Sequence, residues 1–228
     1  SAKTAIATAL ELNPRHGGSL LLMVDQTVDS ELYDQARSTL DQVFEVNPRH
    51  PQACAYRAVL AHLRGDSTEE SAWRAKALSD WSTNPAVDHL IGKKLSQKYR
   101  FAEGAAHQRQ ALKFDADFLP ARIQLSQDLL RLGHEDEGWR LAAEVYESDG
   151  YNVLAHNLVT LQDTLSKFRT LSSDGFVLRM ESSEADIYGQ SALELLEDAK
   201  RKLCAKYDLG LDQRRAVEIL VGCRSVTW

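Results

Sequence analysis

The sequence repeats one short segment at an interval that few folds share. Residues 12–16 read Leu-Asn-Pro-Arg-His, and residues 46–50 read Val-Asn-Pro-Arg-His, 34 residues further along the chain. Counted from Pro14 and Pro48, the same step leads to Ser82, Ala116 and Gly150. Each of these positions falls at a break between predicted helices. A period of 34 residues is typical of stacked helix–turn–helix units, none of which can bury its apolar face alone. The repeat therefore predicts a mainly α-helical solenoid.

Apolar residues recur at helical spacing within each 34-residue unit. In the clearest unit, Leu20 and Val24 share one face of a first helix, and Leu40 lies on the matching face of a second. Ala36 falls where these helices cross, and its small side chain lets the two axes approach closely. We predict four such helix pairs, at residues 17–47, 51–81, 85–115 and 119–148.

The clearest unit resembles the tetratricopeptide repeat. It has an aromatic residue, Tyr33, before the small Ala36, and it closes on Asn-Pro at Pro48. The resemblance implies a right-handed α-α solenoid whose first helices line a concave face. The second unit departs from the pattern, because Arg57 stands where a large apolar residue is expected and Glu70 where a small one is expected. We therefore expect a local distortion in that unit.

The pattern changes near the end of a helix predicted at 152–168, whose leucine stripe suits it to cover the last pair. A turn-rich segment follows, and then a strand–helix–strand pattern. The strands are predicted at 176–180 and 216–221, with a helix from about Ser182 or Ser183 to about Tyr207. The expected domains are a solenoid at 1–168 and a small α/β piece at 169–228.

The α/β piece resembles the opening of a gluzincin-type, peptidase MA-like zinc metallopeptidase domain, which in bacterial proteins follows tetratricopeptide repeats. The resemblance lies in residues 174–180, 184–189, 195–199 and 217–219, and in Lys206-Tyr207. These elements precede the zinc site in that family. The His-Glu-x-x-His motif that would bind zinc is absent from the sequence, and the nearest string, at 134–138, lacks the second histidine. The resemblance implies at most a truncated, inactive front part of such a domain; a small cap on the solenoid is the alternative.

Composition argues against several other classes of protein. The net charge is −6 and no basic stripe occurs, so we expect no nucleic-acid partner. The three cysteines are far apart and form no CxxC pair, which argues against a disulfide framework or a zinc knuckle. The seven histidines are spread over different units without i, i+4 spacing, and we interpret them as solvated or capping side chains. We therefore predict no catalytic residue, no metal ligand, no cofactor and no membrane span.

The first helices offer a surface on which a partner could bind. Nine of their side chains lie opposite the stripe that joins the two helices of a pair, and both charge signs occur among them. They are Leu21, Asp25, Val59, His62, His89, Lys93, Gln97, Gln127 and Arg131. The prediction is a scaffold that binds a protein or peptide on this concave face.

Two alternatives stay open: a solvated face without a partner, and the targeting arm of a zinc-dependent peptidase whose active site lies in a longer parent chain. The first residues read like the middle of a repeat, so we expect the natural protein to begin upstream of residue 1. The partner's identity, the oligomeric state and the compartment are left open by the sequence.

Overall fold

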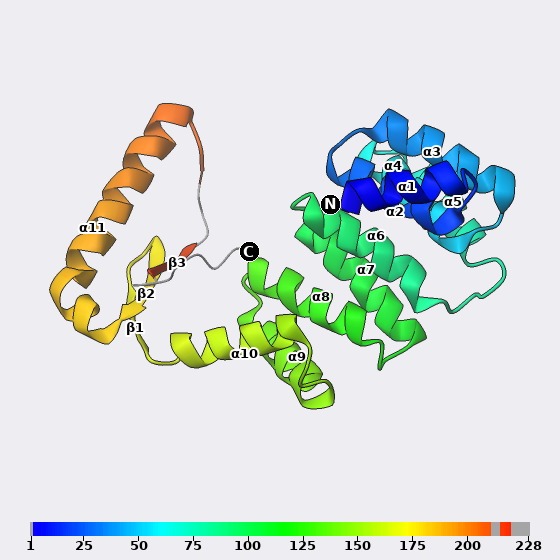
Figure 1. Ribbon diagram of the computed structural model, residues 1–228. Helices are drawn as coiled ribbons and strands as arrows, with labels where there is room; N and C mark the ends of the chain where they lie inside the picture. The colour runs from blue at the N-terminus through cyan, green and yellow to red at the C-terminus, as the bar shows by residue number, and fades with distance from the viewer. Residues whose placement is uncertain (1, 211–214, 220–228) are drawn as a thin grey trace. The chain divides into compact units, whose positions relative to one another are not determined.

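The computed structural model describes residues 2–210 and 215–219 of the chain, which divides into two compact units, Ser1–Gly150 and Tyr151–Trp228 (Figure 1). The first unit is built from helices alone in its described part. They are α1 (Ala2–Leu12), α2 (Gly17–Asp29), α3 (Tyr33–Val46), α4 (Pro51–Leu63), α5 (Ser67–Ala77), α6 (Pro85–Gln97), α7 (Phe101–Phe114), α8 (Leu119–Arg131) and α9 (Glu135–Ser148).

The four predicted helix pairs are confirmed, as α2 with α3, α4 with α5, α6 with α7, and α8 with α9. The turn within each pair places one residue in the left-handed region, and these residues recur every 34 positions. They are Glu31, Gly65, Tyr99 and Gly133, with φ of 62°, 79°, 62° and 82°. Glycine adopts this conformation without a steric penalty, so Gly65 and Gly133 mark their turns in the sequence, whereas Glu31 and Tyr99 do not.

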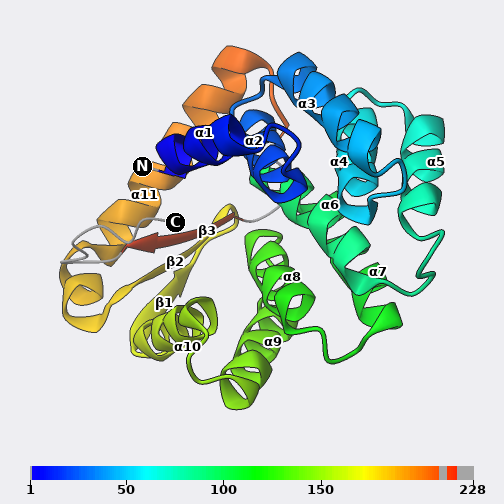
Figure 2. The ribbon, with the colours of Figure 1, turned by 45° about the vertical axis from the view of Figure 1, so that its right-hand side comes forward.

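The first helices of successive pairs pack on one another: α2 contacts α4, α4 contacts α6, and α6 contacts α8. Within residues 2–150, no extensive contact joins α3 with α5, α5 with α7 or α7 with α9. Figure 2 accordingly shows the first helices along the inner edge of this unit and the second helices along its outer edge. The first helices therefore line the inner side of the array.

The distortion expected in the second pair takes the form of a shortened second helix. α5 has 11 residues, whereas α3, α7 and α9 each have 14. Arg57 does not enter the apolar core as the pattern requires; it pairs with Asp41 and lies over the rings of Phe44 and Trp73. The array still stacks without a break, because α4 contacts α2 and α3 of the first pair and α6 of the third.

The second unit contains α10 (Val153–Leu165), β1 (Phe168–Ser172), β2 (Phe176–Glu181), α11 (Ser182–Tyr207) and β3 (Arg215–Ile219). β2 pairs antiparallel with β1 and parallel with β3, so β2, α11 and β3 form a β-α-β unit. Leu178 and Met180 of β2 pack against Ala185 and Leu193 of α11. This is the predicted α/β appendage.

Two features of this unit differ from the sequence-based expectation. β1 begins at Phe168, the end of the helix predicted at 152–168, and runs into the segment interpreted as turn-rich; its inward Leu171 is flanked by outward polar residues that hide the strand pattern. Helix α10 belongs to the second compact unit, so its predicted role as the cap of the last pair, and the boundary at 168, stay predictions. The last two residues of the strand predicted at 216–221 lie outside the described residues.

Candidate functional site

Two of the nine side chains predicted to bind a partner are buried in the core. Leu21 and Val59 are 5% and 0% exposed, so the prediction is wrong for both. Both side chains belong to the apolar core cluster that runs through the first three helix pairs. Packing in this cluster therefore buries apolar positions that the sequence pattern assigns to the surface.

A third predicted residue, Asp25, is tied into a polar cluster that joins three first helices. The Tyr56 hydroxyl of α4 donates to Asp25 Oδ1 at 2.6 Å, and Lys94 of α6 pairs with Asp25 and, at 2.8 Å, with Asp29 of α2. Burial raises the pKa of Asp25, but hydrogen bonds from Lys94 and Tyr56 outweigh it and leave the pKa below its ordinary value. Asp25 is therefore an ionised carboxylate whose charge is compensated by Lys94, and its role is structural.

Lys93, Gln97 and Arg131 are exposed, and Gln127 is partly exposed. Lys93 and Gln127 occupy equivalent positions 34 residues apart, as Gln97 and Arg131 do, so the four side chains form two rows one helical turn apart across α6 and α8. We call the solvent-facing side of α4, α6 and α8 the first-helix face. Which of these residues contact a partner stays a prediction.

The first-helix face, as defined on α4, α6 and α8, displays no carboxylate, whereas the first helix α2 carries Asp25 and Asp29, whose side chains are 38% and 42% exposed. α4 contains no acidic residue, and the acidic residues of α6 and α8 are Asp88 and Asp128, which are 0% and 1% exposed. Lys93 and Arg131 supply exposed positive charge on the same helices. The face is therefore cationic in a chain whose net charge is −6.

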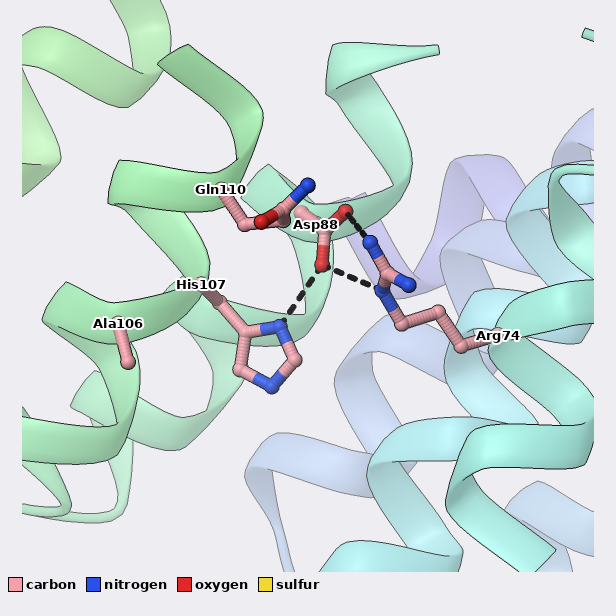
Figure 3. A pocket seen from close by; sticks show the side chains of 5 residues that line it. All are labelled: Arg74, Asp88, Ala106, His107 and Gln110. Carbon is pink, nitrogen blue, oxygen red and sulfur yellow. Dashed lines mark hydrogen bonds and ion pairs between the residues drawn. The ribbon is translucent and has the colours of Figure 1, made fainter. Parts of the chain in front are cut away.

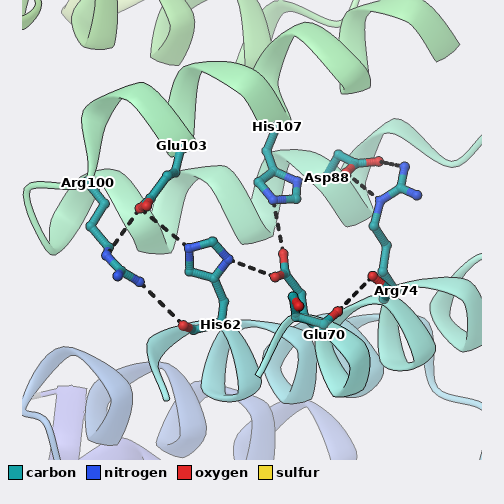
Figure 4. A network of polar contacts seen from close by, with 9 residues as sticks. His62, Glu70, Arg74, Asp88, Arg100, Glu103 and His107 are labelled. Carbon is teal, nitrogen blue, oxygen red and sulfur yellow. Dashed lines mark hydrogen bonds and ion pairs between the residues drawn. The ribbon is translucent and has the colours of Figure 1, made fainter. Parts of the chain in front are cut away.

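A second polar cluster lies between the second and third pairs, where α4, α5 and α7 meet (Figure 4). His62 Nδ1 lies 2.9 Å from Glu70 Oε2, and His62 Nε2 lies 3.4 Å from Glu103 Oε2. His107 Nε2 lies 3.4 Å from the other oxygen of Glu70. The side chains of His62, Glu70 and His107 are each 16% exposed, so these contacts are largely shielded from water.

His107 also borders an open pocket of about 310 Å³, which is lined by Arg74, Asp88, Ala106, His107 and Gln110 (Figure 3). Asp88 accepts hydrogen bonds from Arg74 Nε at 2.7 Å, from Arg74 Nη2 at 2.6 Å and from His107 Nδ1 at 2.9 Å. Burial raises the pKa of Asp88, but the hydrogen bonds from His107 and Arg74 outweigh burial and hold it below the ordinary value. Asp88 is thus a buried anion whose charge is stabilised by Arg74 and His107.

The interpretation of the histidines as dispersed solvated or capping residues is wrong for three of them. His62 and His107 meet in the cluster above, and the predicted partner-binding residue His89 packs on Phe118 and pairs with Gln108. His16 does cap α2, because its Nδ1 accepts from the Ser19 amide. Sequence spacing could not reveal the meeting of His62 with His107, because it depends on how one helix pair stacks on the next.

The pKa of Asp128 is shifted by burial in the direction that lowers stability at neutral pH. Burial raises its pKa to about 6, although the Ser96 hydroxyl donates to Oδ2 at 2.9 Å and Gln124 Nε2 to Oδ1 at 3.0 Å. An unfolded aspartate ionises near pH 4, so between about pH 4 and 6 the folded chain holds a proton that the unfolded chain releases. The stability of the first unit should therefore fall as pH rises through this window.

The Asp128→Asn variant should be more stable than the parent at pH 7.5, by about 1–3 kcal/mol in the free energy of unfolding. The asparagine Nδ2 can donate to Ser96 Oγ, while Oδ1 accepts from Gln124, so both hydrogen bonds survive without a buried charge. Urea unfolding at pH 5 and 7.5 would measure the effect, which should shrink at pH 5. The control is Asp34→Asn, at a side chain that is 98% exposed; equal shifts in both variants would contradict the assignment.

Comparison with solved structures identifies the fold of the helical array. A tetratricopeptide-repeat protein from Parabacteroides merdae matches with a TM-score of 0.51 at 18% identity, over 69% of this chain and 62% of that chain. A thermophilic protein of the same class from Thermus thermophilus matches with a TM-score of 0.50 at 17% identity, over 70% of this chain and 88% of its own. Yeast Tom70 matches with a TM-score of 0.52 at 16% identity, over 71% of this chain and 36% of Tom70.

No family model matches the sequence, and no curated protein matches it. The structural likeness shows that the first unit has the tetratricopeptide-repeat fold, a right-handed α-α solenoid, here followed by a small α/β appendage. Among the helices of the described residues, none combines the length and apolar character that crossing a membrane requires.

Proposed function

We propose that this protein is a binding scaffold whose first-helix face holds an acidic segment of a partner protein. The observation that supports this function is the distribution of charge: the chain is acidic overall, yet α4, α6 and α8 expose cationic and amide groups and no carboxylate. Charge of opposite sign on the partner would steer it to this face and fix its register.

The two rows of side chains suit a carboxylate-bearing ligand. Gln97 and Gln127 offer amide donors, Lys93 offers a mobile ammonium group, and the Arg131 guanidinium can bind a carboxylate with two parallel hydrogen bonds. Arg131 lies over the ring of Phe101, with 5.1 Å between its Cζ and the ring centroid, which limits its freedom before a ligand arrives. Less conformational entropy is then lost on binding.

The first test is binding of a short fluorescent peptide rich in aspartate and glutamate, compared with a lysine-rich peptide of equal length. We expect the acidic peptide to bind more tightly and its affinity to fall as salt is added, because exposed charges are screened. The Lys93→Glu/Arg131→Glu variant should lose about tenfold or more in affinity for the acidic peptide. Fluorescence anisotropy measures all three quantities.

The matched control is Lys113→Glu/Arg140→Glu, which makes the same change of net charge at exposed positions on the second helices α7 and α9. This variant should keep the affinity of the parent within about twofold if the first-helix face is the binding surface. Equal losses in the two double variants, or no preference for the acidic peptide, would overturn the proposal.

The peptidase alternative stays a prediction about a longer parent chain. Its resemblance rests on β2, α11 and the region of β3, and the described part of the second unit supplies no observation that favours it over a small structural domain. The scaffold proposal does not depend on it.

A further inference from the structure

Two imidazoles and one carboxylate, from three different helices, converge between the second and third helix pairs (Figure 4). His62 lies near the end of α4, Glu70 in the first turn of α5, and His107 in α7. One ligand atom from each of the three side chains lies within 4.8 Å of the other two. Ligands of one tetrahedral zinc ion, each about 2.0–2.2 Å from the metal, lie roughly 3.4 Å apart, so only small side-chain adjustments would close a shell here.

The second nitrogen of each imidazole faces a further carboxylate. His107 Nδ1 lies 2.9 Å from Asp88 Oδ1, and His62 Nε2 lies 3.4 Å from Glu103 Oε2. Both carboxylates are in turn held by arginines, Asp88 by Arg74 and Glu103 by Arg100. Histidines that bind metals in proteins have this arrangement, because a carboxylate on the outer nitrogen fixes the tautomer and raises the basicity of the inner one.

The atoms that face the centre of the cluster, namely His62 Nδ1, His107 Nε2 and the Glu70 carboxylate oxygens, then include more hydrogen-bond acceptors than donors. If each imidazole has its proton on the outer nitrogen, His62 Nδ1 and His107 Nε2 both turn lone pairs toward Glu70, whose carboxylate oxygens are also acceptors. Acceptors that face one another in a partly buried site repel unless a cation lies between them. Either one divalent ion or a second proton on each histidine would satisfy the cluster.

The repeat itself provides an internal comparison for this interface. Positions 34 residues apart are structurally equivalent, and the pair His62 and Glu70 corresponds to a hydrophobic or small pair in every other unit. The equivalent pairs are Val28 with Ala36, Ser96 with Gly104, and Leu130 with Gly138. His107 likewise corresponds to Thr39, Trp73 and Leu141. Side chains with metal-binding chemistry thus replace ordinary packing residues at three positions that meet in space.

We propose that His62, Glu70 and His107 bind one divalent transition-metal ion, zinc by preference, which clamps the second helix pair to the third. Two imidazoles and a carboxylate are a ligand set that zinc accepts, and a fourth position is left for solvent. Because the ligands come from α4, α5 and α7, the ion would stabilise the stacked array against separation of these pairs.

The test uses the whole 228-residue chain after removal of metal with a chelator. Equilibrium dialysis against zinc chloride should give one zinc ion per chain, and the thermal midpoint should rise as zinc is added. Cobalt(II), used as a spectroscopic substitute, should show the visible absorption of a four-coordinate ion. A parent chain that binds no zinc, and whose midpoint zinc leaves unchanged, would overturn the proposal and leave protonated imidazoles as the account of the cluster.

The repeat supplies the matched variant. His62→Val/Glu70→Ala introduces the residues that Val28 and Ala36 provide in the first pair, where both are buried and well packed, so the metal-free variant should fold. It should lose zinc affinity by about 100-fold or more and show no zinc-dependent rise in thermal midpoint. His134→Gln, at an exposed histidine before α9, should bind zinc like the parent. Equal zinc affinity in the parent and in His62→Val/Glu70→Ala would mean that any bound ion lies elsewhere, and would contradict the proposed zinc site.

Discussion

Asp88→Ala should lower the free energy of unfolding of the first unit by about 3–5 kcal/mol, measured by urea unfolding at pH 7.5. Asp88 is fully buried and accepts two hydrogen bonds from Arg74 and one from His107. Alanine would leave the Arg74 guanidinium and His107 Nδ1 without their shared acceptor in a partly buried place, and this penalty is larger than the net strength of one hydrogen bond.

The control for this prediction is Asp34→Ala, which removes a carboxylate whose side chain is 98% exposed and which pairs with Arg37. Exposed ion pairs contribute about 0–1 kcal/mol, so the control should unfold close to the parent. A loss of similar size in both variants would show that Asp88 is not the centre of a buried network.

The equivalent interface one repeat earlier offers a stronger check. Leu40 and Cys54 stand where the later interface has Arg74 and Asp88, and both are 0% exposed. Replacing a buried ion pair by apolar residues of suitable size is often neutral, whereas removing one partner is costly. Arg74→Leu/Asp88→Cys should therefore be more stable than Asp88→Ala. The opposite order would show that the charged network itself stabilises the interface.

The helices could be predicted from the sequence because the information that defines them is local. The 34-residue step and the apolar stripes, such as Leu20 with Val24, locate each pair without knowledge of how the pairs stack. β1 escaped prediction because Leu171 is its inward residue between polar neighbours, and such a short edge strand carries little hydrophobic pattern.

The candidate site depends on stacking, which the sequence does not state. Leu21 and Val59 look surface-facing in the sequence pattern of a single helix pair but are buried in the folded array. One signal of the polar cluster was nevertheless present: Glu70 falls at the crossing position where the other pairs have alanine or glycine. A charged side chain at a close-packed crossing needs a partner, and His62, eight residues earlier on the adjacent helix, provides it.

Gly92→Ala should lower the free energy of unfolding by about 3 kcal/mol, because α6 and α7 cross so closely that no Cβ fits. A methyl group there would lie 2.5 Å from Gln108 Nε2 and 2.7 Å from the backbone oxygen of Gly104. Gln108 is fully buried and donates to His89 O, so it has little freedom to move aside.

Gly17→Ala serves as the control for this change, because a Cβ at the first residue of α2 meets nothing within 4 Å. It should leave stability within about 0.5 kcal/mol of the parent or raise it slightly. Since each pair is stabilised mainly by its neighbours, hydrogen exchange in Gly92→Ala should increase in α4 and α8 as well as in α6 and α7. An increase confined to α6 and α7 would mean that the pairs open independently. In that case the first-helix face would not behave as one rigid surface for a partner.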